Sequence, residues 1–267
     1  MGSKRSVAQT LLAYSLMLCL WQLAASLSKS TWLIGPLDVA KVFLDKGFLD
    51  RLLAAYTDTL IRSLAGFLGG LALGLALGLV TGLLSLRLGG VFESLAALAA
   101  SVPGVAWIPL LIAVMGIDSF LLPVTASILA SFPPILYQVY STLRSIDPEE
   151  VAVARTLGAS DTYLLRTIIA PRVVLGLFPA LKIEAVLSWK IVFAVEMIAA
   201  TSGLGYLAMM YADLLDVAHV AALVAVLVAS VALMVRLVSV AENRLVKKLG
   251  LGVENWRSTY TYAAQGY

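Results

Sequence analysis

Six stretches of about 20 mostly apolar residues dominate this chain of 267 residues. A helix of that length crosses the hydrocarbon core of a bilayer, where every backbone polar group needs a partner within the protein. The chain is 61% hydrophobic and 13% charged, whereas a soluble domain is about half apolar and about a quarter charged. These features predict an all-α integral membrane protein with six transmembrane helices. The helices are expected near residues 7–27, 60–86, 92–115, 120–143, 175–201 and 217–240.

The N-terminal stretch has two interpretations. Lys4 and Arg5 precede its apolar run, as in a signal peptide. The run is long and further spans follow it, so we expect residues 1–28 to remain as a transmembrane helix. Residues 29–59 mix four acidic and four basic residues with apolar ones, which favours an amphipathic extracytoplasmic segment at the membrane surface. The single cysteine, Cys19, supports neither a disulfide nor a metal cluster.

Lysine and arginine gather in alternate segments, which indicates the orientation of the spans. The short segments 116–119 and 202–216 contain neither residue. With the N-terminus inside, the cytoplasmic side receives Lys4, Arg5, Arg87, Arg144, Arg155, Arg166, Arg172, Arg244, Lys247, Lys248 and Arg257. Both termini, including the tail at residues 248–267, are therefore expected in the cytoplasm. We expect a multi-pass protein of the cytoplasmic membrane in contact with lipid. The net charge of +3 is too small to indicate a nucleic acid partner.

Glycine recurs every four residues along the second predicted span. The positions are Gly66, Gly70, Gly74, Gly78 and Gly82. This spacing puts a strip without side chains on one helix face, so that another backbone can approach closely. Two interpretations remain open, which are static packing within the bundle and packing that also slides during a conformational change.

A charged island at residues 144–172 interrupts the apolar stretches and carries strong helix signals. Asp147 is a good N-cap, Pro148 suits the first helical position, and Glu150 completes an approximate capping box. Gly158 is expected to end this helix. Ser160 is expected to cap a second short helix, residues 162–170, which Pro171 would stop. The predicted elbow is either an amphipathic hairpin on the lipid headgroups or a docking element for a cytoplasmic partner.

The run ARTLGAS, followed by an apolar helix and Pro171, resembles the EAA loop of binding-protein-dependent ABC importer permeases. In that family the loop, residues 147–171 here, is the coupling helix that inserts into the ATP-binding subunit. A second run at residues 194–210, AVEMIAATSGLGYLAMM, is similar to the nitrate, sulfonate and taurine branch. The resemblance covers about residues 60–245, and it implies a transmembrane core at 60–247. The chain departs from the family pattern where the namesake glutamate falls on Ala152 and where a second proline is replaced by Leu175, whereas Gly158 is retained.

The resemblance implies the permease subunit of an ATP-driven importer, which moves a small solute by alternating access. The solute is expected to be an anion such as a sulfonate, taurine or nitrate. The chain would form a homodimer, an ATP-binding cassette subunit would dock at the island, and an extracytoplasmic solute-binding protein would deliver the solute. The residues expected to contact the ATPase are Glu149, Glu150, Ala152, Ala154, Arg155, Gly158, Ala159 and Ser160. The residues expected along the translocation path or at its gate are Trp189, Lys190, Glu196, Gly203 and Gly205.

Ionisable residues in spans are costly and point to function. In or next to the fifth predicted span they are Lys182, Glu184, Lys190 and Glu196, and in the sixth Arg236. The resemblance gives Glu196 a structural or gating role. Lys190 either faces the pathway and attracts an anion or pairs with an acid elsewhere in the bundle.

No enzymatic chemistry is predicted for the chain itself. It has no GxxxxGK[ST] loop for ATP phosphates, no HExxH or Cys/His cluster for a metal, and no nucleophile beside a candidate base. ATP and Mg²⁺ would therefore bind the partner subunit. Two other functions stay open: an ion-coupled carrier that works alone, and a membrane scaffold that does not transport.

Overall fold

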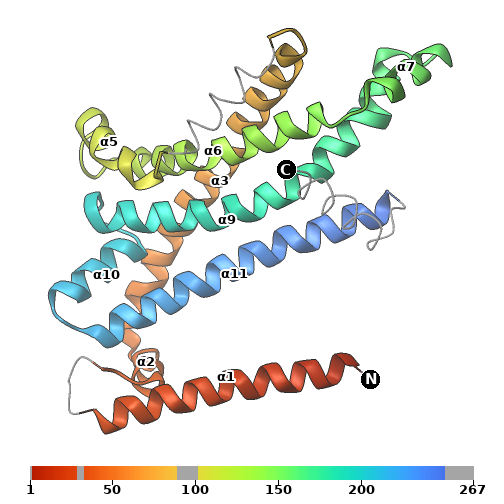
Figure 1. Cartoon of the computed structure of the whole chain (residues 1–267). Coiled ribbons are helices and arrows are strands. Elements are labelled where there is room, and N and C mark those ends of the chain that lie inside the picture. The colour runs from red at the N-terminus through yellow and green to blue at the C-terminus, as the bar shows by residue number, and fades with distance from the viewer. Residues whose placement is uncertain (1, 29–32, 89–101, 250–267) are drawn as a thin grey trace.

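The computed structural model describes residues 2–28, 33–88 and 102–249, and its regular structure there is entirely helical. Four helices in these ranges are long and apolar enough to cross a bilayer, and two shorter apolar helices, Leu12–Leu27 and Gly104–Met115, accompany them. The predicted all-α membrane fold is confirmed. In Figure 1, α6 (Leu121–Arg144), α9 (Ala170–Ala199) and α11 (Val217–Lys248) run alongside one another and α3 (Lys46–Leu88) crosses them. Helix α7 (Pro148–Thr156) lies at one end of the bundle and α10 (Leu204–Asp213) at the other.

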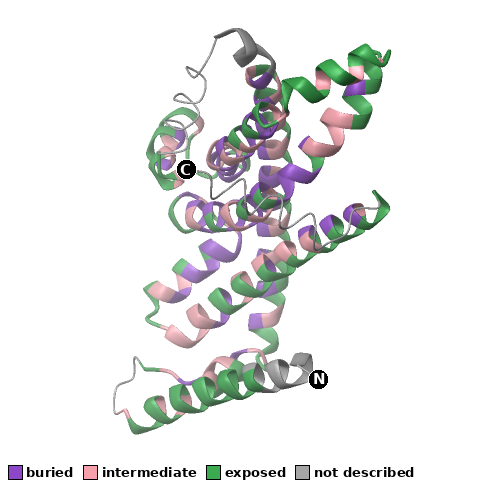
Figure 2. Ribbon diagram, turned by 45° about the vertical axis from the view of Figure 1, so that its right-hand side comes forward, coloured by how far each residue is buried: buried purple, intermediate pink, exposed green. Residues whose placement is uncertain are grey.

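The first helix, α1 (Gly2–Leu27), is exposed along most of its length, as expected for a helix that faces lipid (Figure 2). Its C-terminal end is tied to the short helix α2 (Pro36–Val42). Trp21 Nε1 donates to the carbonyl oxygen of Ile34 at 2.9 Å. The Gln22 side chain accepts from the backbone N–H of Leu37 at 3.0 Å.

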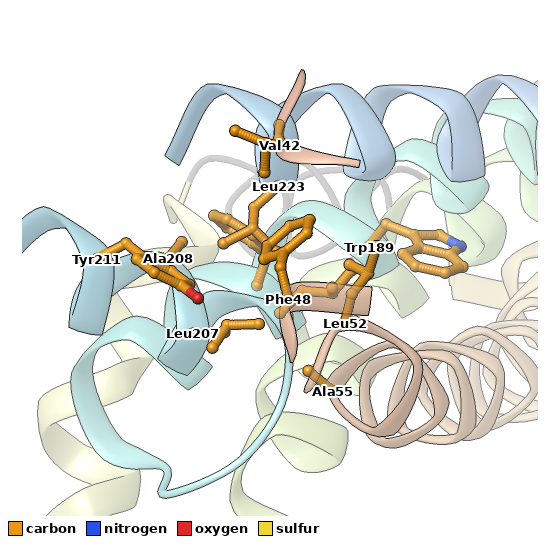
Figure 3. Packing of buried hydrophobic residues seen from close by; sticks show 12 residues of the cluster. Val42, Phe48, Leu52, Ala55, Trp189, Leu207, Ala208, Tyr211 and Leu223 are labelled. Carbon is orange, nitrogen blue, oxygen red and sulfur yellow. The ribbon is translucent and has the colours of Figure 1, made fainter. Parts of the chain in front are cut away.

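The next helix, α3 (Lys46–Leu88), has 43 residues and begins well before the predicted start near Leu60. Its early turns are charged, but their apolar residues pack into the bundle. Phe48 is 1% exposed and lies among Leu52, Trp189 and Tyr211 (Figure 3). This burial stabilises a helix that local polarity alone would assign to the membrane surface.

The third predicted span lies partly outside the described residues. Its described part is a 3-10 turn, η1 (Gly104–Trp107), and the helix α5 (Ile108–Met115). Gly116, with φ of +78°, ends α5. Helix α6 (Leu121–Arg144) follows the fourth predicted span closely and contains Pro133 and Pro134.

The glycine strip of α3 faces α6. A Cβ on Gly74 would lie 2.7 Å from the carbonyl oxygen of Phe132, and one on Gly78 would lie 3.0 Å from that of Leu136. At Gly82, an added Cβ would overlap the Leu143 side chain. The two backbones therefore approach too closely for any side chain between them.

The C-terminal half consists of α9 (Ala170–Ala199), α10 (Leu204–Asp213) and α11 (Val217–Lys248). Lys182 of α9 pairs with Glu242 of α11 at 2.5 Å. Two shorter elements precede α9, namely α8 (Asp161–Leu164) and a π-helical turn, η2 (Leu165–Ile169).

The prediction that Pro171 stops the second helix of the island is wrong. Helical structure runs without a break from Asp161 to Ala199. The π turn lies directly before the proline, and its wider backbone spacing changes the hydrogen-bond pattern where Pro171 has no N–H to donate.

Candidate functional site

The elbow of the charged island has the helix caps that its residues predict. Helix α7 (Pro148–Thr156) begins after Asp147, whose carboxylate accepts from the backbone N–H of Glu149 at 2.8 Å. Ser160 Oγ accepts from the backbone N–H of Tyr163 at 3.2 Å and caps α8. Gly158 lies between them with φ of +86°. No atom lies within 4 Å of a Cβ built there, so the backbone conformation and not the space requires glycine.

Glu150 does not form the predicted capping box. Its two carboxylate oxygens accept from Arg172 at 2.8 and 2.7 Å, so that the pair joins α7 to the first turn of α9. Both bonds come from Arg172 Nη2, and such charge-assisted hydrogen bonds are stronger than neutral ones. Arg155 pairs with Asp161 at 2.8 Å across the bend, with both side chains mostly in solvent. Glu149 is exposed and forms no ion pair within the described ranges.

The bend of the elbow is an exposed surface with an open hollow of about 500 Å³ beside it. Leu157 is 84% exposed at its tip, and the nearby Val153 and Tyr163 are exposed as well, so the elbow presents apolar side chains at its surface. The lining of the hollow is Ala154, Leu157, Gly158, Ala159, Ser160, Tyr163, Thr167 and Ile168. Four of the residues predicted to contact a partner thus lie together, whereas Ala152 lies exposed on α7 outside the hollow.

A second site lies at the other end of α9, around the buried carboxylate of Glu196. Arg62 Nη1 donates to Glu196 Oε1 at 2.8 Å, and Thr59 Oγ1 donates to Oε2 at 2.8 Å. The backbone N–H of Gly205 donates to Oε2 at 3.1 Å. Arg62 also donates to the carbonyl oxygen and the hydroxyl of Ser202, each at 2.8 Å. We call Thr59, Arg62, Glu196, Ser202 and Gly205 the latch.

The two predicted gate glycines complete the latch. Gly203 has φ of +106°, and a Cβ there would collide with the Glu196 carboxylate. A Cβ on Gly205 would collide with the carbonyl oxygen of Phe193. The turn between α9 and α10 therefore closes onto Glu196 only because both positions lack side chains.

Thr59, Arg62 and Ser202 are members of the latch that were not among the predicted site residues. Arg62 lies inside the second predicted span. A charged residue inside a span points to a functional site, and this was the signal in the sequence that could have identified Arg62. Its guanidinium also stacks 5.7 Å from the Phe120 ring centre. The cation has strong partners on three sides, so it is stabilised in a low-dielectric setting.

Trp189 and Lys190 do not join the latch. Trp189 is buried, with its ring centre 6.0 Å from that of Tyr56. Lys190 lies on the uncovered face of α9 with Ile183 and Met197, at spacings of seven residues, and forms no ion pair in the part of the chain that the structure describes. Lys190 was expected either to face the pathway or to pair with an acid in the bundle. The described residues of this chain show no such pairing.

Comparison with known proteins agrees with this arrangement. Residues 74–250 match the family model described as binding-protein-dependent transport system inner membrane component. The taurine transport system permease protein TauC of Escherichia coli is 30% identical over 128 residues, which are 46% of this chain and 45% of that protein. A probable ABC transporter permease protein of Brucella melitensis is 36% identical over 105 residues, 39% of this chain and 42% of that protein. The chain thus matches less than half the length of these curated relatives.

Solved structures share the fold. The MetNI methionine ABC transporter in inward-facing conformations aligns with a TM-score of 0.61 and 19% identity, over 76% of this chain and 98% of that chain. A bacterial ABC transporter that imports alginate aligns with a TM-score of 0.59 and 13% identity, over 91% and 99% of the two chains. The predicted resemblance to ABC importer permeases is confirmed: the chain belongs to the family of binding-protein-dependent transport system inner membrane components, which are multi-pass permease subunits and not themselves enzymes.

Proposed function

We propose that this chain imports a small anionic solute as half of a homodimeric permease, driven by an ATPase that docks on the elbow. The observation that carries the proposal is the unbroken helical run Asp161–Ala199, which has 39 residues. At 1.5 Å per residue it is about 60 Å long. It begins at the elbow and ends beside Glu196, so that a movement of the elbow reaches the latch through one rigid element.

The elbow supports the docking role through its shape. Leu157 projects into solvent beside small residues and the hollow, which suits insertion into a cleft of a cytoplasmic partner. Glu149, the free carboxylate of the first turn, replaces the glutamate missing at Ala152. The partner is an ATP-binding cassette subunit, which binds ATP and Mg²⁺.

The cytoplasmic orientation of the elbow and of both termini is part of the proposal. The N-terminal end of α1, α7 and the C-terminal end of α11 extend toward the same side of the bundle (Figure 1). The last turn of α11 carries Lys247 and Lys248, as expected for a cytoplasmic end. The latch then lies toward the outer side, where a solute-binding protein would deliver its solute.

The uncovered face of α9 supports a pathway between two copies of the chain. A lysine that faces lipid in the middle of a span is costly, so Lys190 belongs at a surface that water or a partner covers. In a homodimer this face lines the passage, and its positive charge favours an anion. Relatives named for taurine and aliphatic sulfonate transport support this class of solute.

The docking role is tested with two matched variants in the intact transporter. Leu157 is 84% exposed at the elbow, and Leu44 is 80% exposed at the far end. We expect Leu157→Asp to abolish co-purification of the ATPase or its stimulation by solute-loaded binding protein, and Leu44→Asp to leave both unchanged. Normal stimulation in the Leu157→Asp variant would refute docking at the elbow.

A further inference from the structure

Glu184 of α9 is a buried carboxyl that neither the elbow nor the latch uses. Glu184 is 0% exposed, and both of its carboxyl oxygens lack a hydrogen-bond partner. A backbone group of Leu71 faces it from α3 without forming a hydrogen bond of ordinary geometry. A buried group of this kind requires an explanation, since nearly all buried polar atoms in proteins are satisfied.

Two serines of α6 and two glycines of α3 lie at the crossing where this carboxyl is buried. A Cβ on Gly70 of α3 would touch Glu184 Oε1 and would lie 2.7 Å from Ser131 Cβ of α6. One turn earlier, a Cβ on Gly66 would lie 2.5 Å from Ser127 Cβ. The hydroxyls of Ser127 and Ser131 are buried and also lack partners. The crossing of α3, α6 and α9 therefore holds a cluster of polar atoms whose hydrogen bonds are not made among themselves.

No cation of the described chain compensates a charge on Glu184. On α3, Arg62 is bound to Glu196, and on α9, Lys182 is bound to Glu242 of α11. None of the other described charged or titratable side chains on α3, α6, α9 and α11 is paired with Glu184; they are Lys46, Asp50, Arg51, Tyr56, Asp58, Tyr137, Tyr140, Arg144, Arg172, Lys190, His219, Arg236, Arg244, Lys247 and Lys248. An ionised carboxylate left alone in such a place costs several kcal/mol or more.

The tight packing around Glu184 favours a proton over a metal ion as the species that neutralises its charge. A hard cation takes about six oxygen ligands and needs the volume for them. At this crossing even one added methyl group on Gly66 or Gly70 would overlap a serine or the carboxyl itself. A proton needs no such volume.

We propose that Glu184 is a proton-binding site at the joint of α3, α6 and α9. The proton comes from water and converts the carboxylate to a carboxylic acid. Its O–H can donate to a helix carbonyl at the crossing. Loss of the proton leaves a buried charge that only separation of α3 from α9 can hydrate, so that protonation is linked to the movement of these helices.

Infrared spectroscopy of the purified full chain at neutral pH tests the proposal directly. A protonated carboxyl has a carbonyl stretch above the amide I band that shifts in D₂O, whereas a carboxylate has none there. Glu242 is the matched control, because it is a glutamate that forms an ion pair with Lys182. We expect the band in the parent and in Glu242→Gln, and its loss in Glu184→Gln. A parent without the band, or a band that persists in Glu184→Gln, would overturn the proposal.

Two further measurements keep the test decisive if Glu184→Gln does not fold. Ser127→Ala and Ser131→Ala should shift the frequency of the band in at least one case, since each removes a neighbouring hydroxyl. A frequency unchanged in both would contradict the location. Thermal stability of the parent should be equal in sodium chloride and in choline chloride, and a sodium-dependent increase would assign the site to a metal ion instead.

Discussion

Arg62 and Glu196, which lie 134 residues apart in the chain, form a buried ion pair at 2.8 Å between α3 and α9. The same guanidinium holds the carbonyl oxygen of Ser202, and the same carboxylate holds the N–H of Gly205. The pair therefore fastens the α9–α10 turn to α3. Such a network is either formed or broken, because opening the turn separates all of its partners together; this behaviour suits the alternating-access cycle proposed above.

Replacing Arg62 by methionine leaves Glu196 buried without its cation. We expect this variant to lose about 3–5 kcal/mol of stability, because the remaining charge stays uncompensated. Thermal unfolding in detergent measures the loss, and Arg51→Met, an exposed position on the same helix, is the control. The double variant with Glu196→Gln should recover part of the stability. A double variant as unstable as the sum of both singles would show that the two residues act independently.

Gly158 is expected to matter for its backbone conformation and not for its size. Its φ of +86° favours glycine or asparagine, and a β-branched residue there costs about 1–2 kcal/mol or more. Gly158→Asn should therefore retain most solute-stimulated ATP hydrolysis in the assembled transporter, and Gly158→Val should lose most of it. Equal losses in both variants would mean that the partner contacts this position too closely for any side chain.

Lys190→Met should weaken uptake of an anionic solute without reducing assembly with the ATPase. The change removes the positive charge from the uncovered face of α9 and preserves the length of the side chain. Initial uptake rates at several solute concentrations in vesicles provide the measurement, and Met197→Leu on the same face is the control. Uptake kinetics equal to those of the parent would give Lys190 a structural role.

Asp216 is expected to stabilise the start of α11 in a pH-dependent way. Burial raises its pKa, but hydrogen bonds from the ring and the backbone N–H of His219 outweigh that effect and hold the pKa below its ordinary value of 3.8. A lowered pKa means that the stabilisation is present above the ordinary value and is lost as the pH falls through the folded-state value. Asp216→Asn retains the helix cap without the charge.

The stability difference between the parent and Asp216→Asn should therefore be present at about pH 5 and should disappear as the pH falls through the folded-state pKa of Asp216. Thermal unfolding of both proteins across this range provides the comparison. A difference that stays constant to the lowest pH would show that the Asp216 charge contributes nothing.

Features with local causes were predictable. The caps at Asp147 and Ser160 depend on one side chain and an amide two or three residues away, and the turn at Gly158 depends on its own backbone. The extent of α3 and the continuity through Pro171 were not predictable in the same way. The first depends on burial of Phe48 against distant helices, and the second on a π turn that local rules do not anticipate.

Apolar length, helix caps and short motifs are properties of neighbouring residues, so the amino-acid order was enough to predict a helical membrane protein with a polar elbow of the ABC importer permease type. The pairings could be seen only in the folded chain: Arg62 with Glu196, Arg172 with Glu150, and Glu184 with no cation of the described chain. In each case, the distance between the charged groups depends on how two helices cross. The crossing is set by the packing of side chains from distant parts of the chain, so it cannot be read from the order of residues.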